Sequence, residues 1–589
     1  MAGRDRLRCH QPALHDLGCD GECQQSVARS GAGGGQLRSP AAATLPLHHA
    51  AGGPAGRDHG IAADVHSGAQ RVSGQPAAGR RPKRDAAGPD LQFHPLDHHA
   101  GPGRDLGRVH RLRRSRDRAA RPPGRSGYLP EIEMTLRPQL ARYKDKTMTS
   151  VSFYEYSKLN AEEKAALLRR SETDISGFIE KVAPILEAVR TEGDKALARF
   201  GRELDKADVT EANLKVTAAE FDAAFKLVDA SVLESVQFGI DNIRKFHEEQ
   251  KPEAMWLKEI RPGAFAGDRF TPIQSVALYV PRGKGSFPSV TMMTSVPAVV
   301  AGVPNLAIVT PPAPDGSVDA ATLVAARLAG VETVYKAGGA QAVAAVAYGT
   351  ETVKPALKIV GPGSPWVVAA KRSLSGVIDT GLPAGPSEVM ILADDTVHGG
   401  LAALDLLIEA EHGPDSSAYL VTHSRRVAEE ALAALPEHWA KMTEQRVAFS
   451  KAVLTGKTGG IVLTSSIEES YAFVNAYAPE HLELLSEQPF IHLGHITEAA
   501  EILMGTHTPV SIANFSLGPN AVLPTSRWAR TFGPLSVTDF VKRSSIGYVT
   551  APAYPEFARH SHNLAIYEGF SSHALAVSPV RDRYLKKGA

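Results

Sequence analysis

The middle of the chain alternates short apolar runs with longer stretches in which apolar residues recur every three or four positions. The runs SVALYVP, NLAIVTPP, TVYKAGG, ALKIVGPG and SEVMILADD fall between residues 275 and 395. Continuous apolar runs of this kind are typical of strands buried on both faces, and the stretches between them are typical of amphipathic helices. The alternation predicts βαβ units with a parallel sheet and a ligand crevice at the carboxyl ends of the strands.

The regions on either side of this series extend the same fold class. Residues 160–250 carry apolar positions at helical spacing with Glu, Lys and Arg between them, which predicts several helices. A second series follows, in which SAYLVTHS and GGIVLTSS are the predicted strands and residues 427–434 and 467–476 are predicted helices. The tail after Leu535 is mixed, with short strands and a final helix.

The beginning of the chain has a different composition. Residues 1–130 hold 19 Arg and one Lys against 11 acids, ten of the 22 His, and all three Cys. Gly, Ala and Pro are abundant and no apolar periodicity is sustained, so this segment cannot bury enough apolar surface to offset its chain entropy. We expect a disordered extension. The excess of Arg over Lys is typical of GC-rich DNA read out of frame, and we expect translation to start at Met148 or Met134.

Other functions for the extension stay open at this point. An Arg-rich arm could bind nucleic acid, although the misread upstream sequence is the interpretation that we favour. Cys9, Cys19 and Cys23 could bind a metal, but they lack the paired spacing of a zinc site. A targeting peptide would need an apolar segment and few acids, and the extension has neither.

The body from Met148 onward contains no Cys and no run of 18 apolar residues. Such a composition predicts a disulfide-free, globular, cytoplasmic protein that does not span a membrane. The whole chain has a formal net charge of +1, so the body is mildly acidic once the basic extension is set aside.

Glycines follow the carboxyl ends of three predicted strands. They are Gly283 and Gly285 in YVPRGKG, Gly338 and Gly339 in KAGGAQ, and Gly361 and Gly363 in VGPGS. Such loops let a backbone approach a phosphate or a sugar, and the helix that follows offers free N–H groups to an anion. None of them has the GxGxxG spacing of the dinucleotide fingerprint. Each glycine alone indicates a turn, but three such loops at one edge of a sheet favour a nucleotide site.

Two later segments bring carboxyl and imidazole side chains together. Glu409 and His412 lie three positions apart in EAEHGPDS, so on a helix they project from one face and can serve one metal or one acid/base site. Glu480 and His481 are adjacent in APEHLEL, where a strand or loop end would let both reach one substrate and divide proton transfers between them. A Glu–His dipeptide taken alone is usually a surface feature.

Five motifs occur in order along residues 150–585: AGPSEV, EAEHGPDS, YAPEHL, GPNAVLPT and EGFSSHA. Together they closely resemble the histidinol dehydrogenase family. The resemblance implies an NAD-dependent, zinc-containing homodimer of histidine biosynthesis that oxidises an amino alcohol to the acid in two hydride transfers. The segment before Met148 has no counterpart in that family.

The resemblance also implies a fold and a division of the chain. The fold class is α/β, with two incomplete Rossmann-like domains that contain parallel sheets, and small C-terminal segments that complete the partner subunit's site. The expected extension is residues 1–147, and the first Rossmann-like domain is residues 148–278 with 387–535. The second Rossmann-like domain, on the NAD side, is residues 279–386, and the C-terminal segments are residues 536–589.

Roles for individual residues follow from the resemblance position by position. Glu480 would activate water and His481 would take the hydroxyl proton, as the catalytic residues. The four zinc ligands would be Glu409, His412, Asn514 and His573, and all four would also contact substrate. His573 would come from the other subunit. The further substrate contacts are Ser387 and Glu568. The residues that would line the NAD site are Tyr279, Gln341 and Ser364.

The chain departs from the family's pattern at four positions. Glu409 stands where the family has a Gln ligand and Asn514 where it has an Asp ligand, so one carboxylate and one amide are kept at exchanged positions. With two neutral imidazoles, the ligand set keeps one negative charge and still suits zinc. Ala521 replaces the His of the family's NHVLPT motif, and Ser364 replaces the Asn of its GPGN motif. Loss of that His removes a polar group near the substrate, so the sequence predicts the reaction type more firmly than the substrate.

The sequence favours L-histidinol as the substrate and leaves two alternatives open. A paralogue could oxidise another amino alcohol or a diol, although a two-electron dehydrogenase would not need the water-activating Glu480. A protein that kept the fold and lost the chemistry could serve binding or regulation, but Ser387, His412, Glu568 and His573 are all retained.

Overall fold

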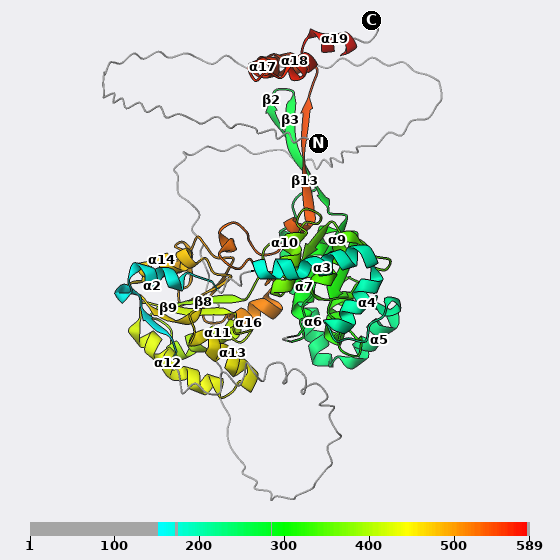
Figure 1. Ribbon diagram of the computed structural model, residues 1–589. Helices are drawn as coiled ribbons and strands as arrows, with labels where there is room; N and C mark the ends of the chain where they lie inside the picture. The colour runs from blue at the N-terminus through cyan, green and yellow to red at the C-terminus, as the bar shows by residue number, and fades with distance from the viewer. Residues whose placement is uncertain (1–150, 171–174, 284, 586–589) are drawn as a thin grey trace, which may run out of the picture. The chain divides into compact units, whose positions relative to one another are not determined.

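The computed structural model describes residues 151–170, 175–283 and 285–585, which Figure 1 shows as ribbons. All of them belong to one compact unit, Ala119–Ala589. The predicted disordered extension lies outside the described residues. The described strands form three sheets, with the orders β1-β10-β9-β8-β11-β12, β6-β5-β4-β7 and β13-β3-β2. The first two are parallel and the third is antiparallel, so the predicted α/β class with parallel sheets is confirmed.

The six-stranded sheet has helices on both faces. Its strands are β1 (Phe153–Glu155), β8 (Glu388–Ala393), β9 (Ser417–Thr422), β10 (Gly459–Leu463), β11 (His481–Leu485) and β12 (Glu501–Met504). One core joins α11 (Gly399–Ala410), α12 (Arg425–Trp439), α13 (Glu444–Leu454) and α16 (Val510–Ile512) to the sheet. A second core joins α2 (Ala161–Leu167) and α14 (Ile467–Tyr477) to the opposite face. Every residue of β8 to β11 is buried, because both faces of each strand are covered.

The four-stranded sheet is also covered on both faces. Its strands are β4 (Ser275–Tyr279), β5 (Asn305–Thr310), β6 (Val334–Lys336) and β7 (Lys358–Val360). The helices on one face are α5 (Ala218–Leu227), α6 (Ala230–Glu249), α7 (Pro288–Ala301) and α8 (Ala320–Ala329). Those on the other face are α3 (Ser176–Glu192), α4 (Asp194–Glu203), α9 (Gly339–Tyr348) and α10 (Pro365–Ser373).

The N-terminal helices are placed differently from the expected grouping of residues 148–278 with the six-stranded sheet. The apolar stripe of α3, which includes Val182 and Leu186, shares a core with Ala277 and Tyr279 of β4. Of the described elements before residue 250, β1 and α2 pack on the six-stranded sheet and α3 to α6 pack on the four-stranded one. The sequence gives the apolar stripe of each helix, but not which sheet the stripe covers.

The antiparallel sheet joins two segments that are far apart in the chain. It consists of β2 (Met255–Arg261), β3 (Ala264–Pro272) and β13 (Val541–Val549), and three helices follow it, α17 (Tyr554–Tyr567), α18 (Ser571–Ala576) and α19 (Pro579–Leu585). Gly267 is required in β3, since a Cβ there would lie 1.9 Å from the Trp256 carbonyl oxygen. The mixed tail was expected from the sequence, whereas the β2–β3 hairpin was not.

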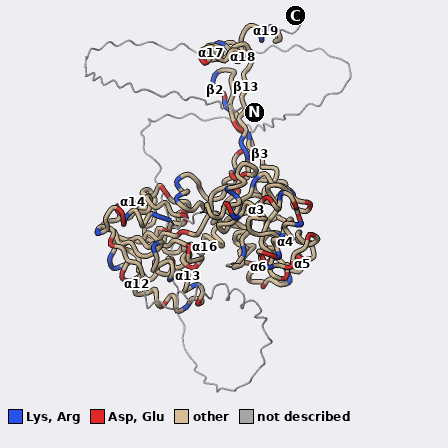
Figure 2. Tube along the Cα trace, viewed as in Figure 1, with Lys and Arg blue, Asp and Glu red and all other residues tan. Residues whose placement is uncertain are grey.

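Charged side chains on the outer helices form mixed surfaces. Lys and Arg lie among Asp and Glu on α12 and its neighbours in Figure 2. On α12 itself, Arg426 pairs with Glu430 across one helical turn at 2.9 Å. No helix within the described ranges combines the length and the apolarity that a bilayer-spanning helix needs.

A buried pair of carboxyl groups joins α11 to β11. Asp405 is 4% exposed, Glu483 is fully buried, and the two carboxyl groups interact with each other. A hydrogen bond between two carboxyl groups requires that one of them keeps its proton. Burial, reinforced by the charge of Asp405, raises the pKa of Glu483 to about 10. The helix that carries Glu409 and the strand that begins at His481 are therefore linked by a shared proton.

Glu483→Gln should remove a pH dependence of stability. The folded protein keeps a proton on Glu483 that the unfolded chain loses above the ordinary pKa of 4.5. The contribution of this proton to the free energy of unfolding is therefore complete below pH 4.5 and is lost as the pH rises towards about 10. Wild-type unfolding free energy should fall by up to about 1.4 kcal/mol per pH unit across this range. The amide of the variant donates a similar bond without a titrating proton. Urea unfolding across the range measures this, with the exposed Glu487→Gln as control; equal slopes for the variant and the wild type would contradict the shared proton.

Candidate active site

The candidate residues of the six-stranded sheet gather at the amino ends of its strands. Ser387 directly precedes β8, Glu480 directly precedes β11, and His481 is the first residue of β11. Helix α11 packs on β8, and its last residues bring Glu409 and His412 to the same edge. The candidate residues of this sheet therefore lie at the amino ends of its strands, whereas the general expectation placed a crevice at the carboxyl ends.

Glu480 is buried among other acidic groups. It is 7% exposed, and its Oε2 accepts a hydrogen bond of 2.7 Å from the backbone N–H of Glu388. Burial raises the pKa of Glu480 well above its usual value, and the carboxylates of Glu409 and Glu388 raise it further. The positive charge of His481 lowers this pKa and only partly offsets the rise. A carboxyl group held in this way can accept a proton more readily than an exposed one.

Arg170 fixes the turn that presents Glu480. Its Nε lies 2.8 Å from Oε1 of Glu388, and both side chains are almost fully buried. Its Nη2 donates to the carbonyl oxygens of Tyr477 and Ala478, and its guanidinium lies 3.3 Å from the centre of the Tyr477 ring. Ala478 has a φ of +56°, an unusual conformation for a residue with a side chain, and the arginine stabilises it. Sequence reasoning missed both Arg170 and Glu388, although Glu388 directly follows Ser387 in AGPSEV.

His481 forms a close pair with Glu501, the first residue of β12. The strand register places the two residues opposite each other, and Nδ1 of His481 lies 2.6 Å from Oε2 of Glu501. Burial lowers the pKa of His481, but the bond to Glu501 and the charges of Glu501, Glu480 and Glu409 outweigh it and raise this pKa to about 10. Glu501 was also missed, since nothing in its local sequence marks it.

Glu409, His412 and Asn514 meet as a group of possible metal ligands. Nδ1 of His412 lies 3.0 Å from Oε2 of Glu409 and 3.1 Å from the Ile408 carbonyl oxygen, which leaves Nε2 free. Nδ2 of Asn514 donates to Oε1 of Glu409 at 2.9 Å, while the buried Oδ1 of Asn514 has no hydrogen-bond partner among the residues that the structure describes. Asn514 lies in η3 (Ala513–Leu517), a π-helical turn of a type frequent at functional sites. The fourth predicted ligand, His573, is not part of this group.

Glu568 and His573 lie in the C-terminal helical segment. Glu568 ends α17 and His573 is in α18, and both are exposed. Within the described ranges, no three His, Cys, Asp or Glu side chains lie close enough together to hold a metal ion. Ala521 is half-buried against the core of the four-stranded sheet, beside the fully buried Asn520.

The predicted cofactor residues lie at the carboxyl ends of the four-stranded sheet. The Tyr279 hydroxyl accepts a hydrogen bond of 3.1 Å from the Gly339 N–H, and the buried Gln341 donates to Asp205 at 3.1 Å. Burial raises the pKa of Asp205 to about 6, against opposing hydrogen bonds from Gln341 and Gly338. Ser364 is exposed at the start of α10, where the first N–H groups of the helix are free. Asp205 was not predicted as a site residue. It follows the end of α4 and connects it to the glycine loop through its hydrogen bonds with Gln341 and Gly338.

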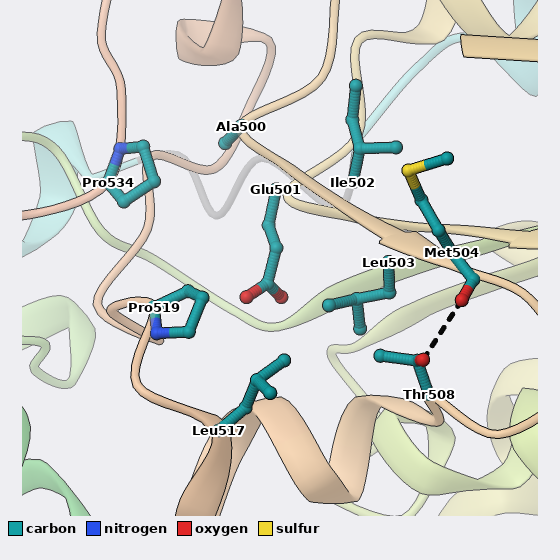
Figure 3. A pocket seen from close by; sticks show the side chains of 9 residues that line it. All are labelled: Ala500, Glu501, Ile502, Leu503, Met504, Thr508, Leu517, Pro519 and Pro534. Atoms are coloured by element: carbon teal, nitrogen blue, oxygen red, sulfur yellow. Dashed lines mark hydrogen bonds between the residues drawn. The ribbon is translucent and has the colours of Figure 1, made fainter. Parts of the chain in front are cut away.

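A cavity of about 370 Å³ lies beside the Glu480–His481 edge. Figure 3 shows the Glu501 carboxylate directed into it from the start of β12, with mostly apolar side chains around it. Its other lining residues are Ala500, Ile502, Leu503, Met504, Thr508, Leu517, Pro519 and Pro534. Glu501 therefore contacts His481 and also lines the cavity.

Comparisons with known proteins agree with these motifs. The histidinol dehydrogenase family model matches residues 168–581. The chain is 98% identical over 456 residues to a protein of Rhizobium meliloti named histidinol dehydrogenase homolog, which covers 77% of this chain and 100% of that protein. It is 48% identical over 421 residues to the Synechocystis protein named histidinol dehydrogenase, covering 72% and 97% of the two chains. The crystal structure of histidinol dehydrogenase from Elizabethkingia anophelis matches with a TM-score of 0.70 at 32% identity, covering 75% and 100%.

Proposed function

The chain belongs to the histidinol dehydrogenase family of oxidoreductases, and we propose that it oxidises an amino alcohol to the carboxylic acid through an aldehyde, with NAD and zinc as cofactors. L-histidinol, giving L-histidine, is the substrate that the family favours. The observation that carries the proposal is the buried Glu480–His481 pair at the same sheet edge as Glu409, His412 and Asn514.

The ligand group fits a zinc ion. Glu409 supplies a buried carboxylate, Asn514 has an unpartnered buried Oδ1, and His412 keeps Nε2 free because its Nδ1 faces a carbonyl oxygen and a carboxylate. That arrangement of a metal-binding imidazole, with its second nitrogen held by a backbone or carboxylate oxygen, is usual in zinc proteins. His573 of a second subunit would complete the set. A zinc ion bound there would polarise and orient the substrate.

NAD would accept the two hydrides that leave the carbinol carbon. Tyr279, Gln341 and Ser364 would hold it where the glycine loops follow β4, β6 and β7. In the first oxidation, the neutral form of His481 takes the proton from the substrate hydroxyl. In the second, Glu480 takes a proton from water that adds to the aldehyde. Ser387 and Glu568 would bind the polar end of the substrate.

We propose that the enzyme is a cytoplasmic homodimer with shared sites. The C-terminal helices expose apolar side chains, Leu564 at 62%, Ile566 at 58% and Phe570 at 53%, and such surfaces are usually covered by a partner. Docking of this segment on a second subunit would bring Glu568 and His573 to the partner's Glu409, His412 and Asn514.

A second candidate is the oxidation of another amino alcohol or a diol. Ala521 supports it, since an alanine cannot hydrogen-bond a substrate group, and a site without that hydrogen bond discriminates less against substrates that lack the group. A non-catalytic binding protein of the same fold is the candidate of another class.

Counting NADH per mole of L-histidinol, before and after zinc removal by a chelator, tests the proposal on the full chain. We expect two equivalents, lost on chelation and restored by added zinc. One equivalent would indicate a two-electron dehydrogenase. Bound zinc without turnover of L-histidinol would move the search to other amino alcohols and diols, and absence of turnover on all of them would indicate a binding protein.

A further inference from the structure

The predicted base His481 is linked to the cavity through Glu501. Its Nδ1 lies 2.6 Å from Oε2 of Glu501, because the parallel pairing of β11 with β12 sets the two side chains on one face of the sheet. This bond settles which imidazole nitrogen is available. With Nδ1 occupied by the carboxylate, Nε2 is the nitrogen that can face a substrate hydroxyl.

The second oxygen of Glu501 has no partner in the described part of the protein. Glu501 is only 6% exposed, and its Oε1 is buried without a hydrogen-bond donor. A buried carboxylate oxygen in this state needs water or a ligand as its donor. Figure 3 shows that the carboxylate is directed into the cavity of about 370 Å³, which is large enough for several water molecules.

A purely structural role explains this arrangement poorly. Burial of an acidic group is unfavourable, and Glu480 and Glu409 already place negative charge around His481. A neutral acceptor such as a carbonyl oxygen would orient the imidazole equally well without adding another charge. What a carboxylate adds is a negative charge at the Nδ1–H bond, which stabilises the imidazolium formed when Nε2 takes a proton.

We propose that Glu501, hydrated from the cavity, is a positioning residue that holds Nδ1 of His481 and stabilises the imidazolium formed when Nε2 takes the substrate proton. This inference rests on the proposed oxidation. As the substrate O–H bond breaks, an N–H bond forms at Nε2 of His481, and the hydride leaves the carbinol carbon for NAD. The N–H bond at Nδ1 stays intact and donates to the Glu501 carboxylate, whose charge stabilises the imidazolium. After the hydride transfer, Nε2 releases its proton to water and His481 returns to its neutral form, so that one proton reaches solvent for the first hydride transferred.

Glu501→Ala and Glu501→Gln separate the two parts of this role. We expect Glu501→Ala to lower kcat by roughly 100-fold with little change in KM, because the base loses its orientation and the charge that stabilises its imidazolium. Glu501→Gln still accepts the bond from Nδ1 but has no charge to stabilise the imidazolium, so its kcat should lie between those of the wild type and Glu501→Ala. Formate is small enough to enter the enlarged cavity, and we expect it to restore roughly tenfold activity to Glu501→Ala. It should restore none to the Glu501→Ala/His481→Ala double variant or to the wild type. Glu487→Ala, an exposed acid after the same strand, serves as control.

A readout without turnover separates this inference from the proposed function. Imidazole carbon-13 NMR, with the His481 signal assigned by its loss in His481→Ala, reports the pKa of His481 directly. The acidic groups that face it are Glu501, Glu480 and Glu409. We expect the pKa of His481 to fall from about 10 towards its ordinary 6.5 in both Glu501 variants and to stay unchanged in Glu487→Ala. If the pKa of His481 falls in the Glu501 variants but the wild-type protein oxidises no alcohol, the proposed function is overturned and the pairing of Glu501 with His481 still stands. An unchanged pKa, or full kcat without formate in Glu501→Ala, would overturn the inference.

Discussion

Glu480→Gln should stop the reaction at the aldehyde, so that the NADH formed per L-histidinol falls from two equivalents to one. The second oxidation requires water to add to the aldehyde, and Glu480 is the carboxylate placed to take the proton of that water. An amide cannot accept it. Loss of a general base costs about 100- to 10,000-fold in rate, which would leave the second step negligible beside the first. The hydroxyl proton of the first step goes to His481, so the first NADH should still form.

Aldehyde trapped with semicarbazide, measured together with NADH, checks this prediction. The trapped aldehyde should rise to one equivalent in Glu480→Gln and stay low in the wild type. The structure supports a clean comparison, since the amide can still accept the 2.7 Å bond from the Glu388 N–H. Glu487→Gln, which changes an exposed acid in the loop after β11, should behave as the wild type. Two equivalents of NADH from Glu480→Gln would assign water activation to another group.

The strands that the sequence predicted belong to the two parallel sheets, which helices cover on both faces. Residues 388–393 of β8 form one continuous apolar run apart from Glu388, and the burial of every residue in β8 to β11 explains why such runs were visible. The β2–β3 hairpin could not be predicted in the same way. All of β2 is exposed, so its residues follow no burial pattern, and its pairing with β13 depends on a segment far along the chain.

Local spacing predicted part of the site. Glu409 and His412 were expected to share one face, and their side chains do meet at 3.0 Å, although α11 already ends at Ala410. Arg170 and Glu501 could not be found by spacing. Arg170 reaches Glu388 through tertiary packing, and Glu501 meets His481 through strand register, neither of which leaves a local signal. The roles that the resemblance assigned to Ser387, Asn514, Glu568 and His573 stay predictions.

Glu409→Gln should lose zinc, and a second change, Asn514→Asp, should bring it back. In the structure, Asn514 Nδ2 donates to Glu409 Oε1 at 2.9 Å, so the two side chains form one unit that carries a single negative charge. Glu409→Gln removes that charge from a ligand set that is otherwise neutral. Loss even of a partner behind a metal ligand costs about 10- to 100-fold in metal affinity, so loss of the charged ligand itself should cost at least roughly 100-fold. NADH formation from L-histidinol should fall with it.

In the double variant, residue 514 carries the carboxylate and residue 409 carries the amide, so the two groups of the hydrogen bond are exchanged. Its Gln amide can donate to its Asp carboxylate, so the charge, the bond and the number of ligand atoms are all kept, and zinc affinity should recover to within roughly tenfold of the wild type. Zinc bound per subunit after dialysis, measured by mass spectrometry, gives this result without any assay of activity. His398→Ala, an exposed imidazole at the other end of α11, controls for adventitious binding. If Glu409→Gln kept its zinc, Glu409 would not be a ligand. If the double variant stayed empty while folded, the position of the charge would matter as well as its presence, and the exchange of Glu409 and Asn514 would not be compensating.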